Sequence, residues 1–228
     1  TATRRDLADP ATAAAVAAAV KTQSVLELLD CLTRADAAAT GPAAWSPWKA
    51  SLVSELVART QAALDGRPEL PRPTLTESQR ELATGGGVQV LIEPGEGVWW
   101  VTVAADDRLG LLGQVAGALA VNRLAVRSAR TETLGERAVT VWSVQPEFGE
   151  PPSLDLLRED IRMALSGGLD IDGKLHARAA AYRRLGTRRP APAQFKLVAD
   201  ASDRATVIEV RAQDAPGLLR TIAHAISS

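Results

Sequence analysis

Two stretches of the sequence repeat each other and decide which fold to expect. Residues 101–112 read VTVAADDRLGLL, and residues 208–219 read IEVRAQDAPGLL. At a constant offset of 107 positions, Asp107 matches Asp214, Gly110 matches Gly217, and both Leu-Leu pairs coincide. Each stretch is an apolar run that leads into an Asp-x-x-Gly-Leu-Leu turn and then into a helical pattern. The sequence therefore predicts a strand–turn–helix unit that occurs twice.

The residues around the first copy complete a recognisable order of elements. A hairpin is expected from strands at 88–92 and 98–105, which flank a Pro-Gly-Glu-Gly turn. After the helix that begins near residue 111, strands are expected at 124–133 and 137–144, then a helix capped by Ser153, then a strand at 195–199. A β-α-β-β-α order with a final strand predicts a ferredoxin-like βαββαβ arrangement in an α+β protein.

An all-helical block precedes this region. Helices are expected over residues 10–20, 24–39 and 47–64. Each follows or begins with a residue that can cap a helix N-terminus, namely Asp9, Ser24 and Ser46. In the second helix three leucines share one helical face and are expected to point inward: Leu28, Leu29 and Leu32.

These patterns divide the chain into four regions. We expect a helical block at 1–65, a proline-rich linker with a short polar helix at 66–86, a first α+β unit at 87–200 and a truncated second copy at 204–228. The first unit is expected to carry a basic insertion at about 172–190. Residue 1 is threonine and the sole methionine is Met163, so we expect the chain to be part of a longer protein.

Composition excludes several classes of function. The 228 residues include 26 Lys and Arg against 27 Asp and Glu, which gives a formal charge of −1 and disfavours a nucleic-acid-binding protein. The single cysteine, Cys31, cannot form an internal disulfide, which favours a reducing compartment. Apolar runs are far shorter than the roughly 20 residues that a membrane span needs. We therefore expect a cytoplasmic protein with neither nucleic acid nor membrane as partner.

The repeated unit resembles the ACT domain, a family of regulatory modules that bind small ligands, usually amino acids. The residues that carry this resemblance are the strand, the Asp-x-x-Gly-Leu-Leu turn, the helix after it, and the two strands and helix that follow. The resemblance implies a ferredoxin-like fold and a ligand at the turn.

The helical block carries a second, more specific resemblance. Its residues 2–6 read ATRRD, 9–10 read DP, 28–29 read LL, 32–36 read LTRAD, 39–42 read ATGP and 45–49 read WSPWK. This block resembles the end of the HD domain of the PII uridylyltransferase/uridylyl-removing enzymes. In that family a nucleotidyltransferase domain is followed by an HD domain and two ACT domains, and the order in this chain is similar.

This resemblance implies a role in nitrogen regulation. In the family, L-glutamine is the effector that binds the ACT domains, and the partner is the PII signalling protein, which one domain modifies and the HD domain restores. The HD domain implies Mg²⁺ or another divalent metal in the parent enzyme. Here only Asp36 matches a metal ligand, the final aspartate of that domain. One carboxylate cannot assemble a hydrolytic metal centre, so we expect the chain itself to be catalytically inactive and to hold no cofactor.

The two turns are the expected ligand-binding site. A helix N-terminus offers unsatisfied backbone N–H groups and partial positive charge, which suit a carboxylate or an amide oxygen. The expected binding residues are Asp107, Arg108, Leu109, Gly110, Leu111 and Leu112 in the first copy, and Asp214, Ala215, Pro216, Gly217, Leu218 and Leu219 in the second. The alternative is that each aspartate merely N-caps its helix and each glycine merely eases the turn.

Two other functions compete with a regulatory region of a PII-modifying enzyme. The chain is alternatively an ACT-type amino-acid sensor of another enzyme, or one that stands alone. A dinucleotide-binding enzyme is rejected, because Gly110, Gly113 and Gly117 have the wrong spacing. The truncated second copy leaves a strand edge unpaired, so we also expect self-association.

Overall fold

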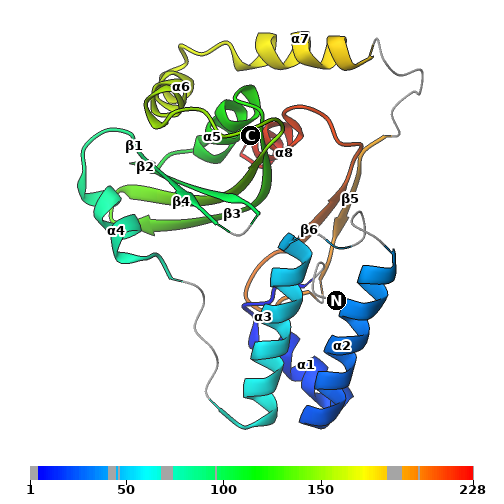
Figure 1. Cartoon of the computed structure of the whole chain (residues 1–228). Coiled ribbons are helices and arrows are strands. Elements are labelled where there is room, and N and C mark those ends of the chain that lie inside the picture. The colour runs from blue at the N-terminus through cyan, green and yellow to red at the C-terminus, as the bar shows by residue number, and fades with distance from the viewer. Residues whose placement is uncertain are drawn as a thin grey trace. The chain divides into compact units, whose positions relative to one another are not determined.

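Both copies of the repeated turn join a strand to a helix in the computed structural model, which describes residues 5–40, 45, 47–67, 74–95, 97–183, 192–199 and 201–227. Gly110 and Gly217 adopt the same left-handed conformation, with φ of +81° and +79°, immediately before their helices. The chain divides into two compact units, one made of residues 1–74 and 191–212 and the other of residues 75–190 and 213–228. The α+β fold class is confirmed (Figure 1).

The first unit contains three helices and a two-stranded ladder. Its elements are α1 (Pro10–Val20), α2 (Gln23–Thr40), α3 (Pro47–Leu64), β5 (Gln194–Leu197) and β6 (Ile208–Arg211). Asp9 caps α1 as expected, whereas the start of α2 is capped by Thr22, whose hydroxyl accepts a hydrogen bond from the backbone N–H of Val25 at 3.3 Å. Ser46 lies outside the described residues, so its predicted cap stays a prediction.

The second unit is built on an antiparallel sheet of order β1-β2-β4-β3. Its strands are β1 (Gln89–Pro94), β2 (Trp99–Asp106), β3 (Leu124–Leu134) and β4 (Arg137–Pro146). Its helices are α4 (Glu77–Thr84), α5 (Leu111–Val121), α6 (Leu154–Ser166), α7 (Ile171–Arg183) and α8 (Leu218–Ile226). The hairpin, both later strands and both helices of the predicted ferredoxin-like unit are present.

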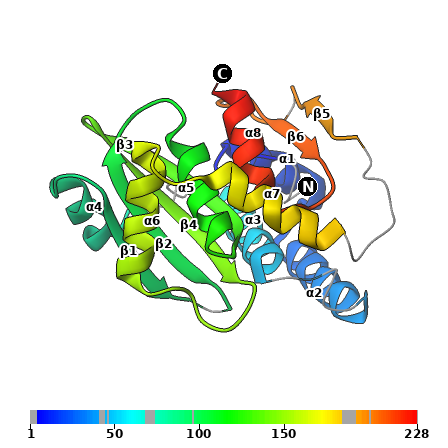
Figure 2. The ribbon, with the colours of Figure 1, turned by 90° about the horizontal axis from the view of Figure 1, so that it is seen from above.

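Helices cover both faces of this sheet. On one face lie α5 and α6 (Figure 2). They bury Leu119 and Leu157 against alternate residues of β2 and β4, including Val101 and Trp142. On the other face, Leu75 and α4 cover the intervening residues of β2 and β4, whose side chains point to that face. Because successive side chains of a strand point to opposite faces, β2 and β4 read as nearly continuous apolar runs.

The expected linker at 66–86 therefore ends earlier than expected. Residues 68–73 lie outside the described part of the chain, but Leu75 is buried against the sheet. Thr76 and Gln79 form a complete capping box at the start of α4, and the side-chain amide of Gln79 also donates to the hydroxyl of Thr102 at 3.3 Å. The cap of this short helix thus fixes it to strand β2.

The strand expected at 195–199 does not join the first sheet. It forms as β5 and pairs with β6, in the register Phe195↔Val210 and Leu197↔Ile208. The edge beside β2 is instead taken by β1, which precedes β2 by a short turn. A local hairpin closes a much smaller loop than a strand some 90 residues further along, so its closure costs less entropy. The β5–β6 hairpin is then the counterpart of β1–β2, and the second copy begins before residue 204.

The predicted inward orientation of the leucines of α2 is wrong. Leu28, Leu29 and Leu32 are 69%, 46% and 65% exposed, and Leu26 is the buried residue of this helix. The spacing of apolar residues predicts that a helix has an apolar face, but not that another element covers it. Within the described residues, no single helix has the length and apolar composition for a membrane span; α1 and α2 reach that length and composition only when taken together, and they are bent by 101°.

Asp9 holds together two distant segments of the first unit. Its carboxylate accepts hydrogen bonds from the backbone N–H of Ala11 at 2.9 Å and from the hydroxyl of Ser202 at 2.7 Å. The backbone N–H of Asp203 donates to it as well. These donors, the Ser202 hydroxyl first, lower the pKa of Asp9 to about 2.

Replacing Leu157 with alanine is expected to destabilise the second unit by about 2–5 kcal/mol, because its side chain is fully buried between α6 and the sheet. Leu156, the preceding residue, is 52% exposed and provides the matched control. Leu156→Ala is expected to change stability by no more than about 0.5 kcal/mol. Urea denaturation of both variants measures the difference, and equal losses would contradict the described packing.

The lowered pKa of Asp9 predicts a specific acid sensitivity. Its carboxylate is stabilised only in the folded state, so this contribution is complete above the unfolded pKa near 4 and is lost as pH falls from about 4 to about 2. Asp9→Asn is expected to remove that part of the pH dependence. Urea midpoints of the two proteins between pH 2 and 5 test this, and parallel pH profiles would contradict it.

Candidate functional site

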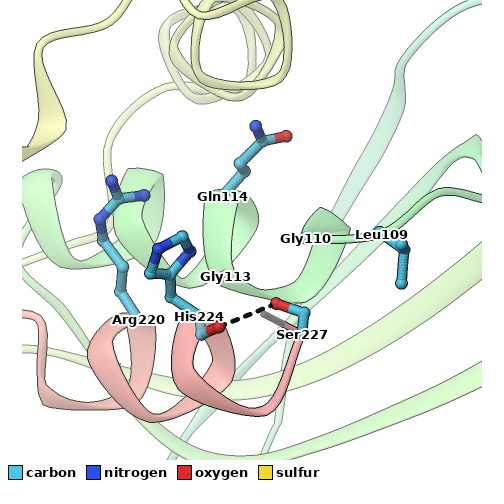
Figure 3. A pocket seen from close by; sticks show the side chains of 7 residues that line it. All are labelled: Leu109, Gly110, Gly113, Gln114, Arg220, His224 and Ser227. Atoms are coloured by element: carbon cyan, nitrogen blue, oxygen red, sulfur yellow. Dashed lines mark hydrogen bonds between the residues drawn. The ribbon is translucent and has the colours of Figure 1, made fainter.

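A polar pocket lies where the start of α5 meets α8. Its cavity volume is about 300 Å³, which is at the lower end for small-molecule sites. The lining residues are Leu109, Gly110, Gly113, Gln114, Arg220, His224 and Ser227 (Figure 3). The first four come from the start of the first repeated helix and the last three from the second, so the two copies build the pocket together.

Glycine allows the two helices to come close. A Cβ placed on Gly113 would lie 3.6 Å from the backbone nitrogen of His224 and 3.7 Å from the Cβ of Ala223. The two helices run antiparallel, because the start of α5 and the end of α8 line the same pocket. The same sequence pattern that forms each helix therefore also places opposite helix ends side by side.

Those helix ends give the pocket a separation of charge. Gly110 is the N-cap of α5 and no side chain caps this helix, so backbone N–H groups of its first turn are available at the positive end of the helix dipole. At the other side, Ser227 follows α8 and donates its hydroxyl to the carbonyl groups of Ala223 at 2.8 Å and His224 at 3.2 Å. This is the negative end of α8.

The polar side chains of the pocket are held by neighbours outside it. Arg220 donates from Nε and Nη2 to the two carboxylate oxygens of Asp172, at 3.0 and 2.9 Å. This ion pair lowers the pKa of Asp172, chiefly through the hydrogen bonds from Arg220. Arg108 donates from Nη2 to Oε1 of Gln114 at 2.9 Å, and also to the carbonyl of Leu165. The pocket thus presents an oriented guanidinium and an oriented amide.

Of the six residues predicted in the first copy, two line the pocket. They are Leu109, whose side chain is 87% exposed, and Gly110. Arg108 acts indirectly by holding Gln114, and the side chain of Leu111 is buried in the core. Asp107 accepts a hydrogen bond from the hydroxyl of Thr133 at 2.9 Å and does not line the pocket.

Leu112 and the second copy depart further from the expectation. Leu112 is 40% exposed, and neither it nor any of the six predicted residues of the second copy lines the pocket. Those six are Asp214, Ala215, Pro216, Gly217, Leu218 and Leu219. The capping part of the alternative is wrong for both copies, because Gly110 and Gly217 are the N-caps and no side chain bonds there. The other part, that each glycine eases its turn, agrees with the left-handed conformation of both glycines.

Five lining residues were not predicted: Gly113, Gln114, Arg220, His224 and Ser227. The last three are spaced by four and three positions, which places them on one face of α8. At the offset of 107 positions Arg220 corresponds to Gly113 and His224 to Gly117. At both positions a glycine of α5 corresponds to a large polar residue of α8. This difference in the sequence indicated that the two helices contribute differently to the pocket.

Asp36 is exposed on α2, and the described residues contain no group of three or more His, Cys, Asp or Glu that could hold a metal ion. The residues described here therefore do not fit the divalent metal of a hydrolytic centre. The role of Asp36 as a former ligand stays a prediction.

Fold and site together define an α+β protein in which a helical block precedes a ferredoxin-like unit, and two repeated helices enclose a polar pocket. Over its whole length the chain is homologous to part of the bifunctional uridylyltransferase/uridylyl-removing enzymes. It is 40% identical to the enzyme of Streptomyces coelicolor over 278 aligned positions, covering all of this chain and 33% of the relative.

Other relatives agree. The enzyme of Mycobacterium tuberculosis is 40% identical over 99% of this chain and 30% of its own length, and that of Gluconobacter oxydans is 32% identical over the whole chain and 30% of its own length. The chain thus spans about a third of these relatives. No family model and no solved structure matches it.

Two glycines of α5 provide a paired test of the helix contacts. Alanine at either position favours the helix by about 1 kcal/mol. At Gly113 the added methyl group makes ordinary contacts, whereas at Gly117 it would lie 2.9 Å from the side chain of Ile171. Gly113→Ala is therefore expected to stabilise the unit, and Gly117→Ala to destabilise it by about 1–3 kcal/mol. Urea denaturation that finds both variants equally stable would contradict this packing.

Proposed function

We propose that the chain is the glutamine-sensing regulatory region of a bifunctional PII uridylyltransferase/uridylyl-removing enzyme. In this proposal, the helical block is the end of an HD domain, the ferredoxin-like unit is an ACT domain, and the second copy begins another ACT domain. The parent enzyme would act on the PII signalling protein in the cytoplasm and would use a divalent metal in domains outside this chain.

The observation that carries the proposal is that both repeat copies build one pocket with opposite helix ends. A free amino acid is a zwitterion, with a carboxylate and an ammonium group close together. The uncapped start of α5 suits the carboxylate, and the carbonyl groups at the end of α8 suit the ammonium group. A pocket with both ends therefore favours an α-amino acid over a simple anion or cation.

Side chains in the pocket support an amide-bearing ligand. The side-chain amide of Gln114 can donate hydrogen bonds and the hydroxyl oxygen of Ser227 can accept one, as the side-chain carbonyl and NH2 of glutamine require. A glutamate carboxylate can only accept hydrogen bonds. The group of the pocket that accepts from the NH2 of glutamine would therefore have no donor from glutamate. Leaving a buried polar group unpaired costs about 1–3 kcal/mol, which is enough for selectivity of tenfold or more.

An ACT-type sensor of another enzyme is the second candidate function. It would use the same pocket in the same way. The homology of the helical block as well as the α+β unit favours the first candidate, because the relatives match the chain from end to end.

Calorimetric titration with L-glutamine tests the proposal, with L-glutamate and L-leucine as control ligands. We expect selective, saturable binding that weakens about tenfold in Gln114→Ala and in Ser227→Ala, because each loses a hydrogen bond to the ligand. Asp107→Ala is the matched control, since Asp107 lies on the same turn but bonds Thr133 instead of lining the pocket.

Two results would contradict this proposal. One is a folded protein that shows no selective binding of L-glutamine. The other is loss of binding in Asp107→Ala while Gln114→Ala and Ser227→Ala bind normally, which would place the ligand away from the pocket.

A further inference from the structure

Helices α5 and α8 are related by an approximate twofold axis. The repeat equates Gly113 with Arg220 and Gly117 with His224. The contacts obey the same exchange: Gly113 faces His224, and a Cβ on Gly117 would lie 3.0 Å from Cδ of Arg220. Exchanging the two helices turns the first contact into the second. The pair Gly113 and Arg220 is its own counterpart, so the axis passes close to these two residues.

This symmetry gives the pocket a counterpart. The pocket lies at the start of α5 and the end of α8, so its counterpart lies at the start of α8 and the end of α5. Gly217 there takes the place of Gly110, Gly117 that of His224, and Ala120 that of Ser227. The counterpart is therefore lined by small residues, with more room than the pocket itself.

Helix α7 fills that room. A Cβ placed on Gly217 would lie only 2.5 Å from Cδ1 of Leu175, and one on Gly117 would lie 2.9 Å from Ile171. Both apolar side chains belong to the main core of the unit, and Leu175 is only 7% exposed. The region expected to be a basic insertion at 172–190 thus belongs, as far as residue 183, to a helix that packs Ile171 and Leu175 into the core.

Polar contacts of Asp172 and Arg178 hold α7 in this position, among them an ion pair between Arg178 and Glu147. Arg178 donates from Nη1 to the carbonyl of Ala120 at 2.7 Å, at the last turn of α5. Asp172 forms the ion pair with Arg220 from the opposite end of α7. The contacting residues Ile171, Asp172, Leu175 and Arg178 follow the spacing of a single helical face. The basic residues that follow in the sequence, Arg184, Arg188 and Arg189, lie outside the described residues.

We infer that α7 is an internal plug for the twofold counterpart of the pocket, so that the repeat pair binds one ligand per chain instead of two. The identity of the ligand rests on the proposed function, whereas the seating of α7 does not. The plug also connects the two sites, because Arg220 lines the open pocket and is held by Asp172 of the plug.

Thiol labelling tests the seating of the plug without any ligand. In a Cys31→Ser background, which removes the exposed native thiol, we compare Leu175→Cys with Ala177→Cys, an exposed position on the same helix. Iodoacetamide is expected to label Cys at 175 at least tenfold more slowly than at 177. Equal rates in folded proteins would overturn the inference.

A second comparison keeps the test decisive if Leu175→Cys does not fold. Amide hydrogen exchange of α7 is measured in Asp172→Asn and in Lys174→Gln, an exposed residue of the same turn. Loss of the ion pair with Arg220 is expected to speed exchange by about two- to fivefold, the range for an exposed pair, and only in Asp172→Asn. Unchanged or equally raised exchange in both variants would overturn the inference.

Stoichiometry tests the consequence for binding. Titration with L-glutamine is expected to give one ligand per chain, and two ligands per chain would overturn the inference. An absence of binding would contradict the proposed function instead, and the labelling rates would still decide whether α7 is seated.

Discussion

The second unit depends on the close approach of α7 and α8 to α5 at Gly113 and Gly117. Helix α5 is largely buried, because the sheet covers one side and α6, α7 and α8 cover most of the rest. A helix that is covered on all sides is apolar on all sides, which explains why its sequence shows no polar face. A larger residue at Gly117 would meet Ile171 and Arg220, whereas alanine at Gly113 still fits at ordinary contact distance and only bulkier side chains would separate α5 from α8 and with it the walls of the pocket.

The sequence predicted those elements whose cause is local. Caps and prolines marked the start of α1, and the offset of 107 positions marked the equivalence of α5 and α8. The pairing of β1 with β2 was predicted as a hairpin, but its consequence was not: β1 takes the edge of β2 that the later strand β5 was expected to use, and the shorter loop decides between them. The exposure of Leu28 on α2 was not predicted for a related reason. The spacing of apolar residues defines a helical face but does not show whether another element covers it.

The site was predicted only in part for the same physical reason. Gly110 was found because it belongs to the turn itself, whereas Arg220 and His224 reach the pocket only through the packing of α8 on α5. In the proposed sensor this arrangement has a use. A ligand that touches both helices binds best at one separation of the two, so its binding free energy favours that separation over others. The ion pair between Arg220 and Asp172 would pass the preference on to α7.

The carboxylate of Asp9 has a consequence for the order in which the chain folds during synthesis. Its hydrogen bond with Ser202 joins residues that are 193 positions apart. Synthesis proceeds from the N-terminus, so α1, α2 and α3 emerge long before the segment that completes their unit. Most of the second unit, residues 75–190, emerges in the interval and can fold first. The first unit is completed only when the segment around Ser202 has been made, so α1 reaches its final contacts later than β1 to β4 can reach theirs.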